Sequence, residues 1–220
     1  MQLFLKGTGI GYGRELSNEI HAPFSSDSTI SGLSWDQAFF DIASGVVFLF
    51  ASWVDMDVLF IAPGNSRGIY QDLAEDYAAI EPPTWALLLA QSCRAVGLEV
   101  GICDANAERL AGTAVYERVQ QAKPRLICFV VYGQNVNAGT VNMSGAIYLA
   151  EYLQAKGVDA PISFVGSHVQ ALPVQTLQAE RSIDFAFTNE GVYALRNVLA
   201  LETIDSTGIA EVKGIVWRDG

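Results

Sequence analysis

From residue 56 onward, short apolar runs alternate with longer stretches in which apolar residues recur at helical spacing. The runs are nearly continuous in Val, Ile, Leu and Phe, which is typical of strands buried on both faces of a sheet. The alternation predicts β-α-β units and a parallel sheet. The expected strands are Asp57–Pro63, Glu99–Asp104, Arg125–Tyr132, Ile162–Gly166 and Asp184–Thr188, with a further edge strand in the closing GIVWRDG.

The stretches between these runs predict helices at about 83–97, 107–122, 141–156, 174–179 and 192–201. Pro83 suits the first turn of the first helix, and Gly97 and Gly157 suit the ends of the first and third. We therefore expect an α/β fold, a doubly wound, mostly parallel five-stranded flavodoxin-like (Rossmann-like) sheet with helices on both faces. The buried face of the first helix is expected to carry Trp85, Leu88, Leu89, Cys93 and Val96.

The segment before Met56 lacks this alternation. It contains GTGIGYG, a Ser-rich stretch and the apolar Ile42–Val54, which is 13 residues long and carries no charge. A membrane-spanning helix needs about 20 apolar residues, so this stretch favours a buried element over a membrane span. We expect residues 1–55 to be an N-terminal extension whose fold the pattern does not define, and residues 56–220 to be the functional domain.

Charge and cysteine content narrow the function further. The net charge is −11, from 24 acidic and 13 basic residues, and no block of Lys or Arg interrupts the acidic excess. Phosphate backbones and anionic membrane surfaces would repel such a chain, so we expect no nucleic-acid partner. The three cysteines form no CxxC motif. This favours buried thiols in a cytoplasmic protein and argues against an iron–sulfur cluster held by this chain.

Candidate site residues lie in the loops after the strands, because ligands of doubly wound sheets bind beyond the carboxyl ends of the strands. The loop after the first strand runs to Pro83. It is far longer than the usual connection of about 2 to 6 residues. These loops are rich in glycine, amides and hydroxyls, as though shaped around one broad, flat, mostly neutral ligand. The candidates are Asn65, Ser66, Arg67, Tyr132, Gly133, Asn135, Gly166, Ser167, His168, Asn189, Glu190 and Gly191.

His168 admits three interpretations: a catalytic base, a metal ligand or part of a cofactor cradle. Ser167 beside it is poorly placed for a catalytic dyad. Zinc would require further ligands, and the only other histidine, His21, lies in the separate N-terminal segment. The other strand-end loops are also rich in glycine and amides, which favours the cofactor cradle. An isolated histidine also fits a structural role. Asn189 and Glu190 equally fit an ordinary helix N-cap. No residue is expected to be catalytic or to bind a metal.

The residues from about Met56 to Gly220 resemble a known family. The motifs are DVLFIAPG, then EPPTWALLLAQSCRAVG, KPRLICFVVY, VGSHVQALP, TNEG and finally VKGIVWRDG, in this order. Together they resemble the cobalamin-binding domain at the N-terminus of cobalamin-dependent radical S-adenosylmethionine enzymes. The family has Gly-Gly-Pro-His and Gly-Glu-Gly turns where this chain has Val165–His168 and Asn189–Gly191.

The resemblance implies cobalamin as cofactor, with its cobalt used for methyl transfer or related radical chemistry. It implies that S-adenosylmethionine and a 4Fe-4S cluster are held by a barrel domain that is absent from this chain, so that the chain alone is not catalytic. The DxHxxG motif of methionine-synthase-like proteins is missing after the first strand, so no lower histidine ligand of cobalt is implied. His168 would then line the pocket of the nucleotide tail.

Two other functions stay open on the residues alone. A flavodoxin-like module would bind FMN or another small molecule, but PGNSRG offers only Ser66 and backbone amides to a phosphate. A non-catalytic regulatory interaction domain of the receiver type would need an aspartate after the third strand. Tyr132 and Gly133 stand there instead.

Overall fold

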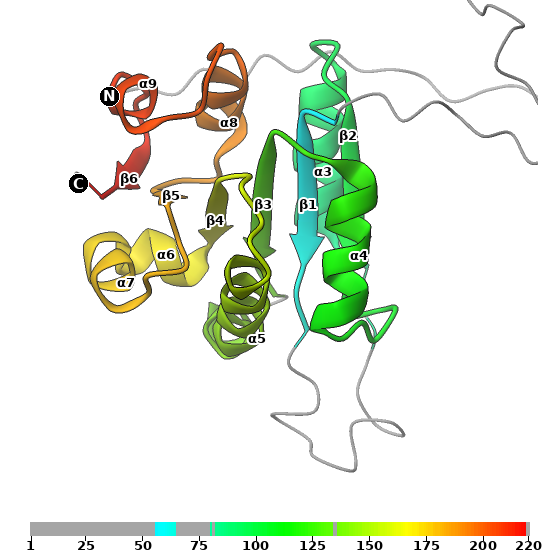
Figure 1. Ribbon diagram of the computed structural model, residues 1–220. Coiled ribbons are helices and arrows are strands. Elements are labelled where there is room, and N and C mark those ends of the chain that lie inside the picture. The colour runs from blue at the N-terminus through cyan, green and yellow to red at the C-terminus, as the bar shows by residue number, and fades with distance from the viewer. Residues whose placement is uncertain (1–55, 65–79, 81, 134–135, 219–220) are drawn as a thin grey trace, which may run out of the picture. The chain divides into compact units, whose positions relative to one another are not determined.

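A six-stranded sheet forms the centre of the structure, a computed structural model that describes residues 56–64, 80, 82–133 and 136–218. The strand order is β2-β1-β3-β4-β5-β6 (Figure 1). The first five strands are parallel, and β6 runs antiparallel to β5. The strands are β1 (Val58–Ala62), β2 (Val100–Asp104), β3 (Leu126–Val131), β4 (Ile162–Gly166), β5 (Phe185–Phe187) and β6 (Ile215–Trp217).

Helices cover both faces of this sheet. One apolar layer packs α4, α5, α6 and α7 against one face, and a second packs α3, α8 and α9 against the other. Figure 1 shows α3 and α4 on opposite sides of β1 and β2. The doubly wound fold expected from the sequence is confirmed, with a sixth, antiparallel strand at its edge. The helices are α3 (Thr84–Arg94), α4 (Gly112–Ala122), α5 (Val136–Ala155), α6 (Ser167–Ala171), α7 (Pro173–Ala179), α8 (Val192–Leu199) and α9 (Ser206–Ala210).

The buried face of α3 differs from the expected one. Ala86, Leu89, Ala90 and Cys93 are buried against the sheet, whereas Leu88 is 57% exposed. Small alanines let the helix backbone approach the strands closely, so the large residues on the flanking positions point outward. The sequence prediction was wrong here because it followed residue size. Of the predicted face, Trp85, Leu88 and Val96 are exposed, and Leu89 and Cys93 are buried.

The glycine stops of α3 and α5 are confirmed. Gly97 and Gly157 have φ angles of 83° and 74°, the left-handed conformation that ends many helices. Two helix starts differ from prediction. α5 begins five residues earlier than expected, at Val136, and α4 begins at Gly112 rather than near 107. In the latter case Asp104 accepts a hydrogen bond from Ala107 N–H at 2.9 Å, which holds the preceding residues in a turn.

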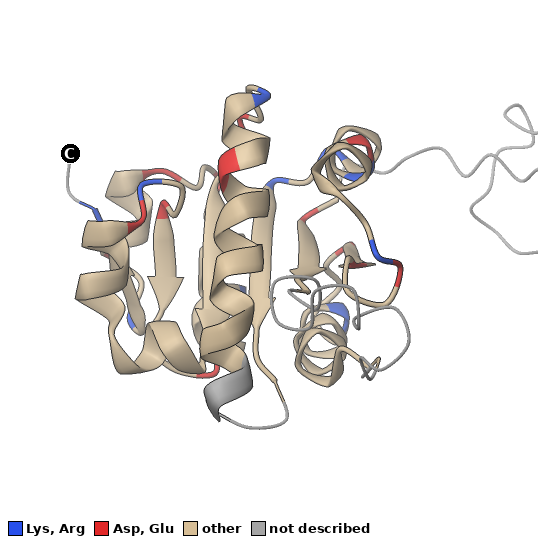
Figure 2. Ribbon diagram, turned by 90° about the horizontal axis from the view of Figure 1, so that it is seen from below, with Lys and Arg blue, Asp and Glu red and all other residues tan. Residues whose placement is uncertain are grey.

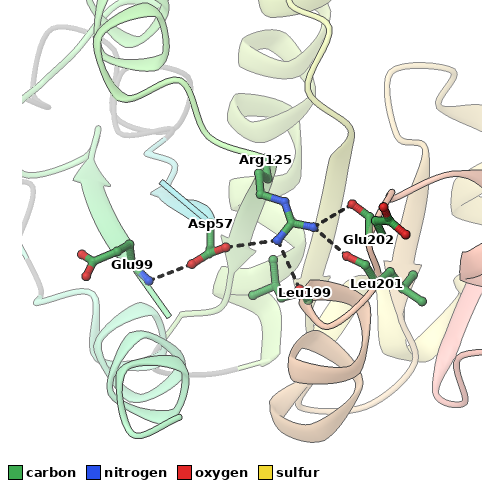
Figure 3. Close-up of polar contacts among 6 residues, drawn as sticks. All are labelled: Asp57, Glu99, Arg125, Leu199, Leu201 and Glu202. Carbon is green, nitrogen blue, oxygen red and sulfur yellow. Dashed lines mark hydrogen bonds and ion pairs between the residues drawn. The ribbon is translucent and has the colours of Figure 1, made fainter. Parts of the chain in front are cut away.

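Arg125 connects β3 to the end of α8 at the amino edge of the sheet (Figure 3). Its Nη1 donates to Asp57 Oδ1 at 3.1 Å and to the Leu199 carbonyl at 3.3 Å. Its Nη2 donates to the carbonyls of Leu201 at 2.6 Å and Glu202 at 3.2 Å. Leu199 is the last residue of α8, and the last carbonyls of a helix lack partners within it. The guanidinium therefore supplies a donor to the end of the helix and to the chain that follows it.

The surface is mixed in charge. Viewed from below, acidic and basic residues are scattered along the ribbon, without a basic face over the described elements (Figure 2). Within the same residues, none of the helices combines the length and apolar character that crossing a membrane requires.

Candidate functional site

The order of the strands reverses between β1 and β3. The chain leaves β1 for β2 on one side and returns to β3 on the other. Ligands of open α/β sheets bind in the crevice beyond the carboxyl ends of the strands at this point. These ends lie at the lower edge of β1 and β3 in Figure 1. The residues that follow β1, β3, β4 and β5 therefore define the candidate site, called here the carboxyl edge.

Gly166 closes β4 at this edge, and its lack of a side chain has a cause within the protein. It pairs with Val131 of β3, and a Cβ on Gly166 would lie 2.2 Å from the Val131 carbonyl oxygen. A Cβ on Gly139 of α5 would lie only 2.1 Å from Ser167 Oγ. The end of β3, the start of α6 and the first part of α5 therefore meet without space between them. Gly166 is a candidate site residue in the sequence, and packing against Val131 already requires a glycine at this position.

His168 lies in the first turn of α6, where the sequence predicted a loop. Its side chain is partly buried, and Nδ1 is 3.4 Å from Thr140 Oγ1 of α5. Two residues on, Gln170 Nε2 donates to the Tyr132 hydroxyl at 2.8 Å. α6 therefore directs His168 toward α5 and Gln170 toward Tyr132. An amide and a neutral imidazole can each donate and accept a hydrogen bond.

Tyr132 follows β3 directly and is the best-anchored side chain of the site. Its ring stacks on Trp85 of α3, with centroids 4.5 Å apart and an interplanar angle of 24°. Burial is the main cause that raises the pKa of the Tyr132 hydroxyl to about 12, and Glu190 and Cys128 contribute less in the same direction. At neutral pH the hydroxyl is therefore protonated and can donate or accept a hydrogen bond.

The turn after β5 is held by its own side chains. Asn189 Oδ1 accepts from Gly191 N–H at 2.8 Å, and Gly191 has a φ angle of 79°. A Cβ on Gly214, in the approach to β6, would lie 2.9 Å from Asn189 Nδ2. Asn189 thus stabilises this turn. It is not the helix N-cap that the sequence had left open for Asn189 and Glu190, because Gly191 is the N-cap residue of α8 and no side chain caps that helix. Glu190 is exposed beside it and close enough to Tyr132 to influence its pKa.

The loops after β1 and β2 meet at the same edge. A Cβ on Gly64 would lie 2.3 Å from Asn106 Oδ1, so these two residues are in contact. Gly133 is partly buried after Tyr132. The remaining sequence candidates, Asn65, Ser66, Arg67 and Asn135, lie outside the described residues.

Four residues of the carboxyl edge were missed as site residues from the sequence: Trp85, Asn106, Thr140 and Gln170. Trp85 was assigned to the core, although its place in the first turn after Pro82-Pro83 puts it at the edge where the first loop ends. That position was the available signal. Thr140 and Gln170 gave none, because the early start of α5 and the helical form of α6 decide which neighbours they meet.

The three cysteines are buried in the core. Cys93 and Cys128 are buried in the layer of α3 and α8, and Cys103 is buried in the opposite layer. Burial raises the pKa of Cys93 and of Cys103 to about 11 and that of Cys128 to about 12. They are neutral thiols in the core at physiological pH. Among the residues with described positions, no cluster of three or more His, Cys, Asp or Glu is arranged to hold a metal ion.

Comparison with known families shows to which family this chain belongs. The B12 binding domain family matches residues 70–199. A comparison with curated proteins gave no match. Because the matched region covers more than half of the chain, the protein belongs to the B12-binding domain family. Membership implies that the chain binds cobalamin, and the observed fold is the α/β arrangement expected for such a domain.

The residues of the carboxyl edge fit such a ligand. Cobalamin is large, flat in its ring system and bears many amide groups. The edge supplies an aromatic surface and uncharged hydrogen-bonding side chains at the topological switch point, which suits this chemistry. The members that the structure brings together are Trp85, Tyr132, Thr140, Ser167, His168 and Gln170.

Proposed function

We propose that this chain is the cobalamin-binding part of a radical S-adenosylmethionine enzyme of the methyltransferase class. The observation that carries the proposal is the match to the B12-binding family together with the switch-point edge described above. The radical context rests on the resemblance of motif order in the sequence. In this role the chain binds and positions cobalamin, and a separate domain or subunit holds the 4Fe-4S cluster and S-adenosylmethionine.

The site residues divide by the part they would play. Backbone and side-chain donors of α6, with Thr140, would hold the amide-bearing periphery of the cofactor, and His168 would line the wall for its nucleotide tail. Bound cobalamin would supply a cobalt centre that carries a methyl group or an electron. The part of the chain itself is to bind, orient and shield the cofactor.

The cysteines support the division of labour. All three are neutral and buried, and they lie in two layers on opposite sides of the sheet. A 4Fe-4S cluster is held by cysteine thiolates that converge on one point. Any cluster that works with this domain is therefore held by other cysteines. Free, unpaired thiols also fit the cytoplasm that we propose as its location.

Cobalamin binding is tested directly with the full chain. We expect hydroxocobalamin to coelute with the protein in gel filtration at about one equivalent. A ligand at 100 times its Kd should also raise the free energy of unfolding by about 2.7 kcal/mol. FMN serves as the comparison ligand, because a flavodoxin-like module would retain FMN and release cobalamin. That result would overturn the assignment.

The role of His168 is tested by His168→Ala. We expect weaker cobalamin binding and an unchanged melting temperature, since the side chain is only partly buried and its contact with Thr140 is long. Gln178→Ala is the matched control, because Gln178 is an exposed polar residue of the neighbouring helix α7. Equal affinity of the two variants for cobalamin would remove His168 from the site.

The radical context needs a separate test. A tagged chain is isolated without oxygen from cells of its own source, and the material is assayed for iron, labile sulfide and cleavage of S-adenosylmethionine. We expect the isolated material to contain both cobalamin and iron. We also expect it to form 5′-deoxyadenosine or S-adenosylhomocysteine from S-adenosylmethionine. Cobalamin without any turnover of S-adenosylmethionine, in material that contains the intact partner proteins, would refute the radical part and leave cobalamin binding standing.

A further inference from the structure

The stacked pair Trp85 and Tyr132, called here the aromatic ledge, lies at the border of the core layer of α3 and α8, against which Tyr132 packs. Trp85 is in the first turn of α3, the helix that follows β1, and Tyr132 follows β3. β1 and β3 are the strands between which the sheet order reverses. The ledge therefore joins the two elements that border the switch-point crevice, which is where ligands of this fold class bind.

The aromatic ledge is held by a hydrogen bond and by ring stacking, and it remains partly exposed. Gln170 Nε2 donates to the Tyr132 hydroxyl at 2.8 Å, and burial keeps that hydroxyl protonated. The two rings, 4.5 Å apart and tilted by 24°, restrain each other. Trp85 nevertheless remains 37% exposed. An indole that is fixed by stacking and still has exposed surface is prepared for a further stacking contact, because little side-chain entropy remains to be lost.

The chemistry of the ledge selects one class of contact. Both rings are uncharged at neutral pH, and Glu190, whose charge is felt by Tyr132, is exposed at its border. An anionic group would be repelled by this carboxylate, whereas a flat, uncharged conjugated ring would stack on the indole.

We propose that the aromatic ledge is a stacking surface for a flat conjugated ring of the bound cofactor, and that Gln170 is a positioning residue that fixes its orientation. The inference rests on cobalamin binding as proposed above. Cobalamin contains two such rings, the corrin and the benzimidazole base of its nucleotide tail. They share the chemistry that the ledge recognises, and they can be separated because cobinamide keeps the corrin and lacks the base.

The test uses the full chain and equilibrium titrations with hydroxocobalamin and with cobinamide. Trp85→Ala removes the exposed ring and is expected to weaken cobalamin binding about 10- to 100-fold, the range of a lost aromatic stacking contact. Trp85→Phe keeps a ring and should recover most of the affinity. Leu88→Ala is the matched control, since Leu88 lies one turn along α3 and is 57% exposed. It should bind cobalamin as the parent does.

The pattern of losses identifies the ring. A loss with both ligands assigns the ledge to the corrin, and a loss with cobalamin alone assigns it to the base. Gln170→Leu removes the hydrogen bond to Tyr132 and should weaken the same ligand by a smaller factor, with an unchanged melting temperature. Parent-like affinity of Trp85→Ala for cobalamin would overturn the ledge alone. A parent chain that binds neither ligand would overturn the proposed function and the ledge with it.

Discussion

Glycine serves two different purposes in this chain. Gly166 has an extended backbone, and the space that a Cβ would occupy is filled by the Val131 carbonyl, so its requirement comes from packing. Gly157, after α5, has a φ angle of 74°, and no neighbouring group lies within 4 Å of the place that a Cβ would take. Its requirement therefore comes from the backbone alone. The two positions separate a steric cost from a conformational one.

Alanine substitutions test this distinction. Gly166→Ala should lower the free energy of unfolding by about 3 kcal/mol, because strand backbone has to move to relieve the contact. Gly157→Ala should cost about 1 kcal/mol, the penalty of a left-handed residue that bears a Cβ. Urea unfolding measures both. A cost at Gly166 no larger than that at Gly157 would contradict the close approach of β3 and β4.

The buried thiols predict an alkaline loss of stability. From an ordinary value near 9, burial raises the pKa of Cys93, Cys103 and Cys128 to about 11, 11 and 12. Below about pH 9 the thiols are neutral in both states, and stability is unaffected. Between pH 9 and 12 the unfolded chain loses thiol protons first, so stability falls as pH rises.

Two measurements follow for the thiols. The urea midpoint should drop between pH 8 and pH 10.5 in the presence of a reductant. At pH 8 a thiol reagent such as DTNB should react slowly with the native chain and rapidly with three thiols after denaturation, in keeping with the three cysteines of the sequence. Rapid reaction of all three in the native chain would show that the cysteines are not buried.

At the scale of elements, the helices are placed by how closely they approach the sheet and by what ties their ends. α3 approaches through Ala86 and Ala90, and α8 is joined to it where Arg196 Nη2 donates to the Ser92 carbonyl at 2.6 Å. At the same end of α8, Arg125 supplies donors to the carbonyls of Leu199 and Leu201 (Figure 3). These cross-links fix α8 relative to both α3 and β3.

Arg125→Met should destabilise the chain by about 1–2 kcal/mol, because it removes the donor to several carbonyls and the ion pair with Asp57 while it keeps the apolar stem. Partial exposure of the guanidinium limits the loss. Arg118→Met is the control, since its ion pair with Glu108 is exposed and should contribute less than about 0.5 kcal/mol. Equal unfolding free energies of the two variants would refute the special role of Arg125.

At the scale of the whole molecule, the described core consists of the sheet and one apolar layer on each of its faces. Both faces of the sheet are covered by helices drawn from residues 84–210, and the family match of residues 70–199 lies almost entirely within the same region. We propose, as the sequence pattern indicated, that the domain boundary falls near Met56.

A chain that begins at Met56 tests the boundary. It should unfold cooperatively at the same temperature as the full chain and bind hydroxocobalamin with the same Kd, because it keeps the six-stranded sheet, the helices on both of its faces and the whole region that the family matches. Circular dichroism melts and absorbance titrations measure the two quantities. Aggregation or a markedly lower melting temperature would show that residues 1–55 contribute to the stability of the domain.

The sequence by itself determined the order of the strands and of all helices except the short α6 and α9, because near-continuous apolar runs and glycine stops encode local structure directly. The runs from Val58 and Leu126 became central strands, and Gly97 and Gly157 ended their helices as predicted. The sequence also placed Tyr132 and His168 beyond strand ends, since parallel strands bring their following loops to one edge.

The tertiary structure alone decided which side chains meet there. The stacking of Trp85 on Tyr132 and the hydrogen bond from Gln170 depend on how closely α3 approaches the sheet and on α6 beginning directly after β4. Closeness of approach is set by packing against small residues such as Ala86 and Ala90, and no local pattern encodes it. For the same reason the contact of Gly166 with the Val131 carbonyl could not be predicted from the sequence.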